Sequence, residues 1–237
     1  MKIQGIIFDK DGTLFDFNKT WSKWAESFLN RLTSEMHSRE SNDLKSDLSN
    51  LLGYDLNTRV FHGDSVVIAD TPEAGINKIK PLLPNYNFND LLELSNKLAR
   101  ETTVFEVVPL LSFLNKLISL KLLLGVATND TEESARHQLK NVGVEDLFSS
   151  IKGSNSGFGA KPDPEMCLAV CSELCLEPQE VIMVGDSLHD LEAGNKAGMI
   201  TVGVLSGPAQ RSELELQSNF ILKDISFLPS WLLRNID

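Results

Sequence analysis

The chain has 237 residues, of which 42% are hydrophobic and 23% are charged, and this composition is typical of a globular protein. Its formal net charge of −11 opposes binding to nucleic-acid phosphates and anionic membranes, so we expect neither partner. No apolar stretch approaches the roughly 20 residues of a membrane helix. The sequence enters its first predicted strand directly after Met-Lys, which leaves no room for a signal peptide, so we expect a cytoplasmic protein.

The first predicted strand, Ile3–Phe8, is a short apolar run rich in β-forming residues, and it ends in two carboxylates, Asp9 and Asp11. Residues two positions apart in a strand point to the same side, so both acids face one site if the extended geometry persists. Like charges this close repel unless a cation or a shared proton relieves them. Gly12 then permits a sharp turn, and Thr13 adds a hydroxyl. A solvated Asp-Gly turn is the plain structural alternative.

The segment that follows, residues 17–104, is predicted to be helical. Apolar residues recur there at spacings of three and four, which favours helices over residues 20–37, 41–52, 72–80 and 88–105. Residues 66–68 are the one candidate for a short strand.

From residue 107 onward, predicted helices and strands alternate. Helices are expected at residues 109–120, 131–142, 164–175, 188–197 and 214–217, and strands at 121–128, 147–151, 181–184, 200–204 and 220–222. This order implies a parallel sheet with right-handed crossovers, and continuously apolar strands imply helices on both faces. We therefore predict an α/β fold: a doubly wound, Rossmann-like, mostly parallel core formed by residues 1–16 and 105–237, with an inserted all-helical cap at residues 17–104.

Polar side chains follow several of these strands, and ligands of open α/β sheets bind beyond the carboxyl ends of the strands. They provide carboxylates, a hydroxyl and an ammonium, which suit a hard cation and phosphoryl oxygens. Each has a plain alternative on its own, since a threonine can simply be a strand residue, a lysine a surface loop residue and an aspartate a helix N-cap. Four successive occurrences in order make these alternatives improbable. The residues are Asp9, Asp11, Thr128, Asn129, Lys161, Asp186 and Asp190.

In that order, the four groups resemble the four motifs of the haloacid dehalogenase-like hydrolase superfamily. The similarity covers about residues 1–16 and 105–205 and is most specific at Asp9-Lys10-Asp11-Gly12-Thr13-Leu14 and at Gly185–Asp190. It implies a Mg²⁺-dependent phosphatase that works through an aspartyl-phosphate intermediate. Asp9 is then the nucleophile and Asp11 the general acid and base.

The resemblance also implies how the cofactor and the substrate are held. Mg²⁺ would be bound by the Asp9 carboxylate, by the backbone carbonyl of Asp11 and by Asp186, with Asp190 orienting these ligands. Phosphoryl transfer depends mainly on positioning and charge neutralisation, which the remaining motif residues would supply. We expect Lys10 to point away from the site with little effect. The expected substrate-binding residues are Gly12, Thr13, Thr128, Asn129 and Lys161.

Within the superfamily, the insert and the Gly159-Ala160-Lys161-Pro162 segment resemble phosphoglycolate phosphatase-like proteins, which implies a small phosphorylated metabolite such as 2-phosphoglycolate as the partner. A β-phosphoglucomutase-type phosphomutase and, less favoured, a non-catalytic binding protein on the same core are the alternatives. A true haloacid dehalogenase is disfavoured because the second acid is present. The chain is expected to be a monomer or a homodimer. Candidate cap residues for selecting the substrate are Arg59, His62, Ser65 and Thr71, and for each the alternative is an ordinary surface loop residue.

Overall fold

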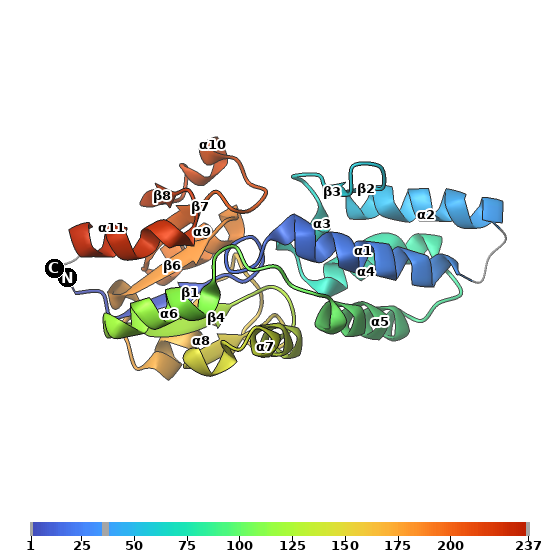
Figure 1. Cartoon of the computed structure of the whole chain (residues 1–237). Coiled ribbons are helices and arrows are strands. Elements are labelled where there is room, and N and C mark those ends of the chain that lie inside the picture. Colours follow the sequence, from blue (N-terminus) through green and yellow to red (C-terminus); the bar gives the residue numbers. More distant parts are fainter. Residues whose placement is uncertain (1, 35–37, 236–237) are drawn as a thin grey trace.

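The structure is a computed structural model that describes residues 2–34 and 38–235. Its core is a six-stranded sheet in the order β5-β4-β1-β6-β7-β8, and every pairing is parallel (Figure 1). The strand that leads to Asp9 is central, and its last residue, Phe8, lies level with Val126 of β4 and Val184 of β6. The carboxyl ends of these three strands therefore meet at one edge. The strands are β1 (Gly5–Phe8), β4 (Leu123–Ala127), β5 (Ser150–Lys152), β6 (Val181–Gly185), β7 (Ile200–Val204) and β8 (Phe220–Leu222).

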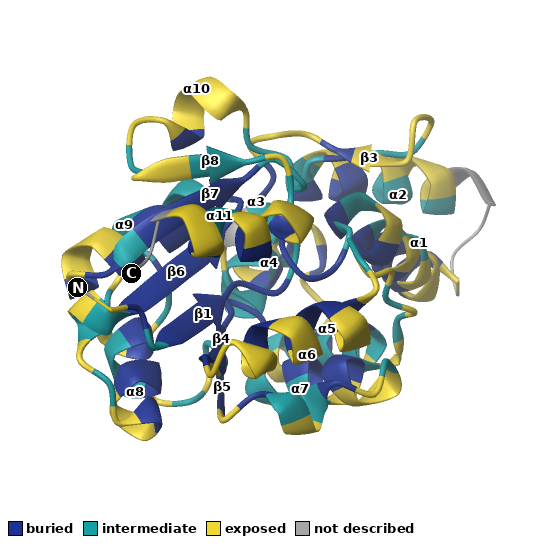
Figure 2. Cartoon of the chain, turned by 60° about the vertical axis from the view of Figure 1, so that its left-hand side comes forward, coloured by how far each residue is buried: buried dark blue, intermediate teal, exposed yellow. Residues whose placement is uncertain are grey.

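Helices cover both faces of this sheet, which confirms the doubly wound prediction. Ile6 and Phe8 of β1 pack in one apolar cluster with α6 and α11, whereas Ile7 between them packs in another with α8 and α9. Figure 2 shows the central strands buried between these layers. The helices of the core are α6 (Leu110–Ser119), α7 (Glu132–Asn141), α8 (Glu165–Leu174), α9 (Leu188–Ala197), α10 (Arg211–Leu214) and α11 (Leu228–Asn235).

The segment between β1 and α6 forms a second lobe with its own apolar cluster, in which Trp24 stacks on Phe28 (Figure 1). The two chain crossings between the lobes pair with each other: Asp16 N donates to Phe105 O at 2.7 Å, and Val107 N donates to Leu14 O at 2.9 Å. The elements of this cap are α1 (Phe17–Thr33), α2 (Ser38–Leu52), β2 (Tyr54–Asp55), β3 (Val60–Phe61), α3 (Val66–Ala69), α4 (Pro72–Ile79) and α5 (Phe88–Glu101).

The cap differs from its prediction in two places. It contains two short strands, and residues 66–68, predicted as a strand, are helical. A short antiparallel ribbon joins β2 to β3, because the Asp55 side chain accepts from Asn57 N and Thr58 N and thereby closes a tight turn. Two-residue strands are too short to show an alternating pattern in the sequence. Residues 66–68, predicted as a strand, begin the helix α3 instead, because Ser65 Oγ accepts from Val67 N and caps it.

Other predicted boundaries shift by a few residues. The helix expected at residues 20–37 begins earlier, at residue 17, and residues 35–37 lie outside the described part of the chain. The helix expected at 214–217 lies at 211–214, where Gln210 and Glu213 form a capping box. Among the described helices, none is both long enough and apolar enough to cross a membrane.

Candidate active site

The Lys161 ammonium stands at the centre of the site, beyond the carboxyl ends of β1 and β4. It lies 2.6 Å from Asp9 Oδ1, 2.6 Å from Asp190 Oδ1 and 2.7 Å from the carbonyl oxygen of Ala127, and it is buried. Burial alone would lower the pKa of Lys161, but the charges of Asp190 and Asp9 outweigh burial and raise it. The lysine is therefore held as a cation against the expected nucleophile.

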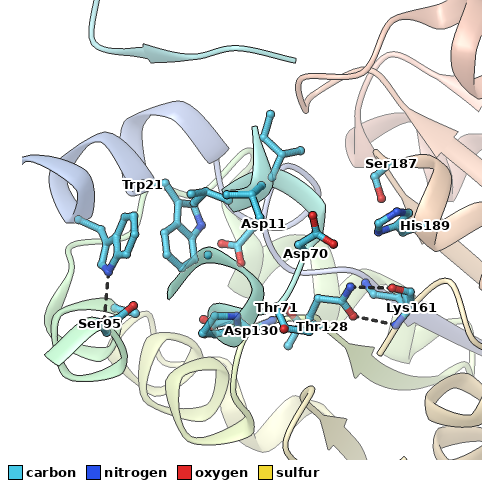
Figure 3. Close-up of a pocket in the computed structure, with 18 of the residues that line it drawn as sticks. Asp11, Trp21, Asp70, Thr71, Ser95, Thr128, Asp130, Lys161, Ser187 and His189 are labelled. Carbon is cyan, nitrogen blue, oxygen red and sulfur yellow. Dashed lines mark hydrogen bonds between the residues drawn. The ribbon is translucent and has the colours of Figure 1, made fainter. Parts of the chain in front are cut away.

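A hydrogen-bonded bridge places this lysine. Asn129 Nδ2 donates to Lys161 O, and Lys161 N donates to Asn129 Oδ1, both at 2.9 Å (Figure 3). The loop that carries Lys161 is thus fastened to the residue that follows Thr128 at the end of β4. Thr128 lines the cavity above the site, and its Oγ1 accepts from Asp130 N at 3.1 Å. Asn129 also lines this cavity, so it can contact a ligand while it positions the lysine.

Three buried carboxylates, those of Asp9, Asp186 and Asp190, gather around Lys161, with ligand oxygens within 4.8 Å of one another. Burial raises the pKa of Asp9 to about 7; Lys161 opposes this shift, and Asp190 and Asp11 add to it. Burial, followed by the charges of Asp9 and Asp190, also raises the pKa of Asp186 well above its ordinary value. Three acids against one ammonium leave an excess of negative charge that a divalent cation would relieve.

The surroundings of Asp186 fit an oxygen-liganded cation such as Mg²⁺. Thr13 Oγ1 donates to Asp186 Oδ1 at 3.0 Å, so one carboxylate oxygen is oriented. A Cβ on Gly12 or on Gly207 would collide with the Asp186 carboxylate, and Gly12 has a φ of +87°, which favours glycine. Ser206 Oγ donates to Gly12 O at 2.7 Å and ties these two loops together. The backbone therefore packs tightly round an all-oxygen donor set, which is the preference of Mg²⁺.

These positions bear on three expected roles. Asp190 lies in the first turn of α9, and its carboxylate accepts from Ser187 N at 3.0 Å and from Ser187 Oγ at 2.7 Å. Ser187, the N-cap of α9, therefore fixes the orientation of this carboxylate. Gly12 and Thr13, expected to bind substrate, support Asp186 and are not among the residues that line the cavity. Gly207 was missed because a glycine after a predicted strand end gives no specific signal.

We expected the Lys10 side chain to point away from the site and to have little effect, but it lies against Asp11. Its side chain is fully buried, and its ammonium lies 2.5 Å from Asp11 Oδ2, 3.2 Å from Asp130 Oδ2 and 2.6 Å from Gln138 Oε1. Burial would lower the pKa of Lys10, but the charges of Asp11 and Asp130 outweigh it and raise the pKa. The alternation of a strand stops at Asp9, because Leu14 N already donates back to Lys10 O in a turn.

Asp11 consequently has two different oxygens. Oδ2 pairs with Lys10, whereas Oδ1 is buried without a hydrogen-bond partner and the residue lines the cavity. A buried polar atom without a partner is unfavourable unless a ligand or water completes it. Asp11 is not part of the cluster formed by Asp9, Asp186 and Asp190.

A cavity lies between this site and the cap, and both lobes contribute residues to its lining. Figure 3 shows Asp11, Thr128 and Lys161 on the core side, with Trp21, Asp70 and Thr71 from the cap. Of the four cap residues expected to select the substrate, only Thr71 lines it.

The other three residues lie elsewhere. Arg59 is exposed and pairs with Glu26 at 3.2 Å, His62 is exposed, and Ser65 Oγ donates to Leu52 O at 2.5 Å. Trp21 was missed as a cavity residue because its spacing fits the apolar face of a helix equally well.

A parallel sheet with an aspartate at its central strand end, faced by a buried lysine and two further aspartates, defines a Rossmann-like hydrolase core. The chain belongs to the haloacid dehalogenase-like hydrolase family, whose model matches residues 6–204.

Two similar sequences are a phosphoglycolate phosphatase and a pyrophosphatase. The phosphoglycolate phosphatase of Psychrobacter arcticus is 33% identical over 124 residues, which is 52% of this chain and 54% of the relative. The pyrophosphatase PpaX of Bacillus pumilus is 28% identical over 227 residues, which is 95% of this chain and 94% of the relative. The first match thus spans about half of that protein's length, whereas the second spans nearly all of it.

Solved structures agree on the fold. A predicted phosphoglycolate phosphatase from Haemophilus somnus superposes with a TM-score of 0.70 at 18% identity, covering 98% of both chains. A β-phosphoglucomutase from Clostridium difficile gives a TM-score of 0.67 at 18% identity, covering 98% of this chain and 96% of the other. At this level of identity the likeness establishes the architecture alone.

Proposed function

We propose that this chain is a Mg²⁺-dependent phosphatase that hydrolyses a small phosphorylated metabolite through an aspartyl-phosphate on Asp9. The observation that carries the proposal is the pairing of Asp9 with a buried Lys161, next to an Asp11 whose Oδ1 has no partner. The phosphatase and pyrophosphatase names of the sequence relatives support the same class of reaction.

The first step forms a bond between an Asp9 oxygen and phosphorus and breaks the bond between phosphorus and the ester oxygen. The departing oxygen takes a proton from Asp11, a residue that lines the cavity and whose buried Oδ1 has no partner. Lys161 and Thr128 would bind the non-bridging phosphoryl oxygens, and the Lys161 charge offsets the negative charge that crowds the site.

The second step returns the enzyme to its starting state. Asp11, now ionised, takes a proton from water, and the resulting hydroxyl oxygen attacks phosphorus and displaces the Asp9 carboxylate. Inorganic phosphate leaves with the oxygen from water. A Mg²⁺ ion held by Asp9, Asp186 and the Asp11 backbone carbonyl, with Asp190 in support, would supply charge neutralisation to the phosphoryl group. The cap excludes bulk water during both steps.

The test is turnover of p-nitrophenyl phosphate with and without Mg²⁺ by the intact chain and by Asp9→Asn and Asp11→Asn. We expect Asp9→Asn to abolish turnover, and Asp11→Asn to lower kcat by about 10²–10⁴-fold, the usual contribution of a general acid. Asp146→Asn, an exposed carboxylate outside the cavity, is the matched control and should match the unmodified chain. Full activity of Asp9→Asn would contradict the proposal.

A further inference from the structure

The wall that the cap contributes to the cavity is apolar and aromatic. Most of its apolar side chains come from α1, α3 and α4, and Leu52 of α2 and Ala99 of α5 add to them. They place indole, phenyl and branched aliphatic surface opposite the carboxylates of the core. The main contributors are Trp21, Trp24, Phe28, Val67, Ile68 and Ile76.

The same wall provides no positive charge. Among the described residues that line the cavity, the basic ones are Lys161 and His189, and both belong to the core. The ammonium of Lys161 is already engaged by Asp9 and Asp190. Of the described cap residues that line the cavity, the one with a charged side chain is Asp70, which is negative. The Lys10 ammonium of the core lies 5.6 Å from the centroid of the Trp21 ring, but it is already paired with Asp11 and Asp130. A second anionic group on a substrate would therefore lose its hydration here and meet no free counter-charge, which is strongly unfavourable.

Two buried polar atoms give this wall a limited polar character. Trp21 Nε1 and Asn96 Oδ1 belong to cavity-lining residues, and neither has a hydrogen-bond partner. Trp21 is only 8% exposed. The neighbouring Trp24 differs, because its Nε1 donates to Ser95 O at 3.1 Å (Figure 3). A ligand that accepts from Trp21 and donates to Asn96 would satisfy both atoms, whereas a ligand with many hydroxyls would leave most of them unpaired.

Resting on the proposed phosphatase function, we propose that the substrate is a phosphomonoester of a neutral, mainly apolar alcohol that carries one or two hydrogen-bonding groups. Its phosphate occupies the Lys161 end of the cavity, and its apolar body packs on the indole of Trp21. This class differs from the expected 2-phosphoglycolate, whose carboxylate would find a donor in Trp21 Nε1 but no counter-charge in the wall. It also disfavours pyrophosphate and hexose phosphates, and with them the phosphomutase alternative.

The direct test compares two esters that differ at one group. Benzyl phosphate and 2-phosphoglycolate both carry phosphate on a CH₂ group, and the second substituent is phenyl in one and carboxylate in the other. With Mg²⁺ present, we expect kcat/KM for benzyl phosphate to exceed that for 2-phosphoglycolate, and that for pyrophosphate, by at least about 100-fold, a difference that desolvating one unpaired charge readily produces. A preference for 2-phosphoglycolate or pyrophosphate would overturn the inference and leave the proposed phosphatase intact.

A gain-of-charge variant tests the same point within the cavity. Gly75 lines the cavity from α4, and a Cβ there would meet no heavy atom within 4 Å, so the backbone can carry a side chain at this position. We expect Gly75→Lys to shift the ratio of kcat/KM values toward 2-phosphoglycolate by at least about tenfold, because an ammonium now faces its carboxylate. Gly63→Lys is the matched control, since Gly63 is equally open but lies outside the cavity, and its ratio should be unchanged. An unchanged ratio for Gly75→Lys would contradict the inference.

Binding of non-hydrolysable analogues separates failure of the inference from failure of the proposed function. Benzylphosphonate and phosphonoacetate form the corresponding pair, and the shift in melting temperature with Mg²⁺ reports binding without chemistry. We expect benzylphosphonate to give the larger shift. If phosphonoacetate gives the larger shift, the wall does not select apolar groups. If neither analogue binds and neither ester is hydrolysed, the proposed phosphatase fails, and the inference that rests on it fails too.

Discussion

The Lys10 ammonium is fully buried, and replacing it should reveal how strongly this network supports the protein. Lys10→Met keeps most of the side-chain volume but removes the charge from between Asp11, 11% exposed at its side chain, and Asp130, 3% exposed. It also removes the donor to Gln138 Oε1. Breaking a buried ion pair by deleting one partner costs about 3–5 kcal/mol, because the remaining charge stays buried without compensation.

This magnitude is easily measured by thermal unfolding. In a chain of this size, 1 kcal/mol corresponds to a shift of roughly 2–4 °C, so Lys10→Met should lower Tm by roughly 6–20 °C. The loss should be partly restored in Lys10→Met combined with Asp130→Asn, because one of the two stranded carboxylates is then neutral. Lys140→Met, which changes an exposed lysine, should remain within about 0.5 kcal/mol of the unmodified chain.

The network around Lys10 also reaches the cap. Gln138 Nε2 donates to Ala99 O in α5 at 2.8 Å, so the network that holds Asp11 also touches the cap. A Lys10→Met variant as stable as the unmodified chain would refute the claim that Lys10 compensates two buried acids. The claim would also be refuted if the stability lost in the double variant equalled the sum of the losses in Lys10→Met and Asp130→Asn, since additivity would mean that Lys10 and Asp130 do not interact.

Three further predictions concern the carboxylate site. In the metal-free protein, the pKa of Asp9 is about 7 instead of its ordinary 3.8, so between these pH values the unfolded chain holds fewer protons than the folded one, and the contribution of Asp9 to stability is lost as the pH rises from about 4 to about 7. Mg²⁺ binds the ionised form of Asp9, so the rise in Tm that Mg²⁺ causes should be larger at about pH 8 than at about pH 5. A larger rise at about pH 5 would contradict this prediction. Gly207→Ala should abolish the Mg²⁺-dependent rise in Tm, because its Cβ collides with Asp186; an unchanged rise would mean that Asp186 is not a ligand. Asn129→Ala, measured with p-nitrophenyl phosphate, should lower kcat by releasing the loop that holds Lys161; an unchanged kcat would show that the bridge does not position the lysine.

The positions of the main polar groups could be predicted because they follow from topology. Once strands and helices alternate, the residues after each strand must meet at one edge, and Asp9, Lys161 and Asp186 do meet there. Side-chain direction beyond the strand could not be predicted in the same way. The turn at Gly12 ends the alternation, so Lys10 lies against Asp11 instead of away from it.

The cap was predicted less well, because its contacts are set by packing between segments far apart in the sequence. Helical spacing identified the buried face that includes Trp21, but spacing does not distinguish core packing from the wall of a cavity. The Ser65 cap and the turn closed by Asp55 are local side-chain contacts that override the strand and helix propensities of a few residues. The cap side of the cavity therefore required the structure, whereas the meeting of Asp9, Lys161 and Asp186 at the sheet edge did not.

The central claim is that Asp9 forms a covalent bond to phosphorus, and the stereochemical course of the reaction tests it most directly. The substrate is a thiophosphate ester made chiral at phosphorus by its sulfur and two oxygen isotopes, and it is hydrolysed in water that carries the third isotope. Its thiophosphoryl group passes through one in-line displacement by Asp9 and a second by water. Two displacements predict net retention of configuration in the inorganic thiophosphate released by the Mg²⁺-loaded protein. Net inversion would mean that water attacks the substrate directly, and would contradict the account.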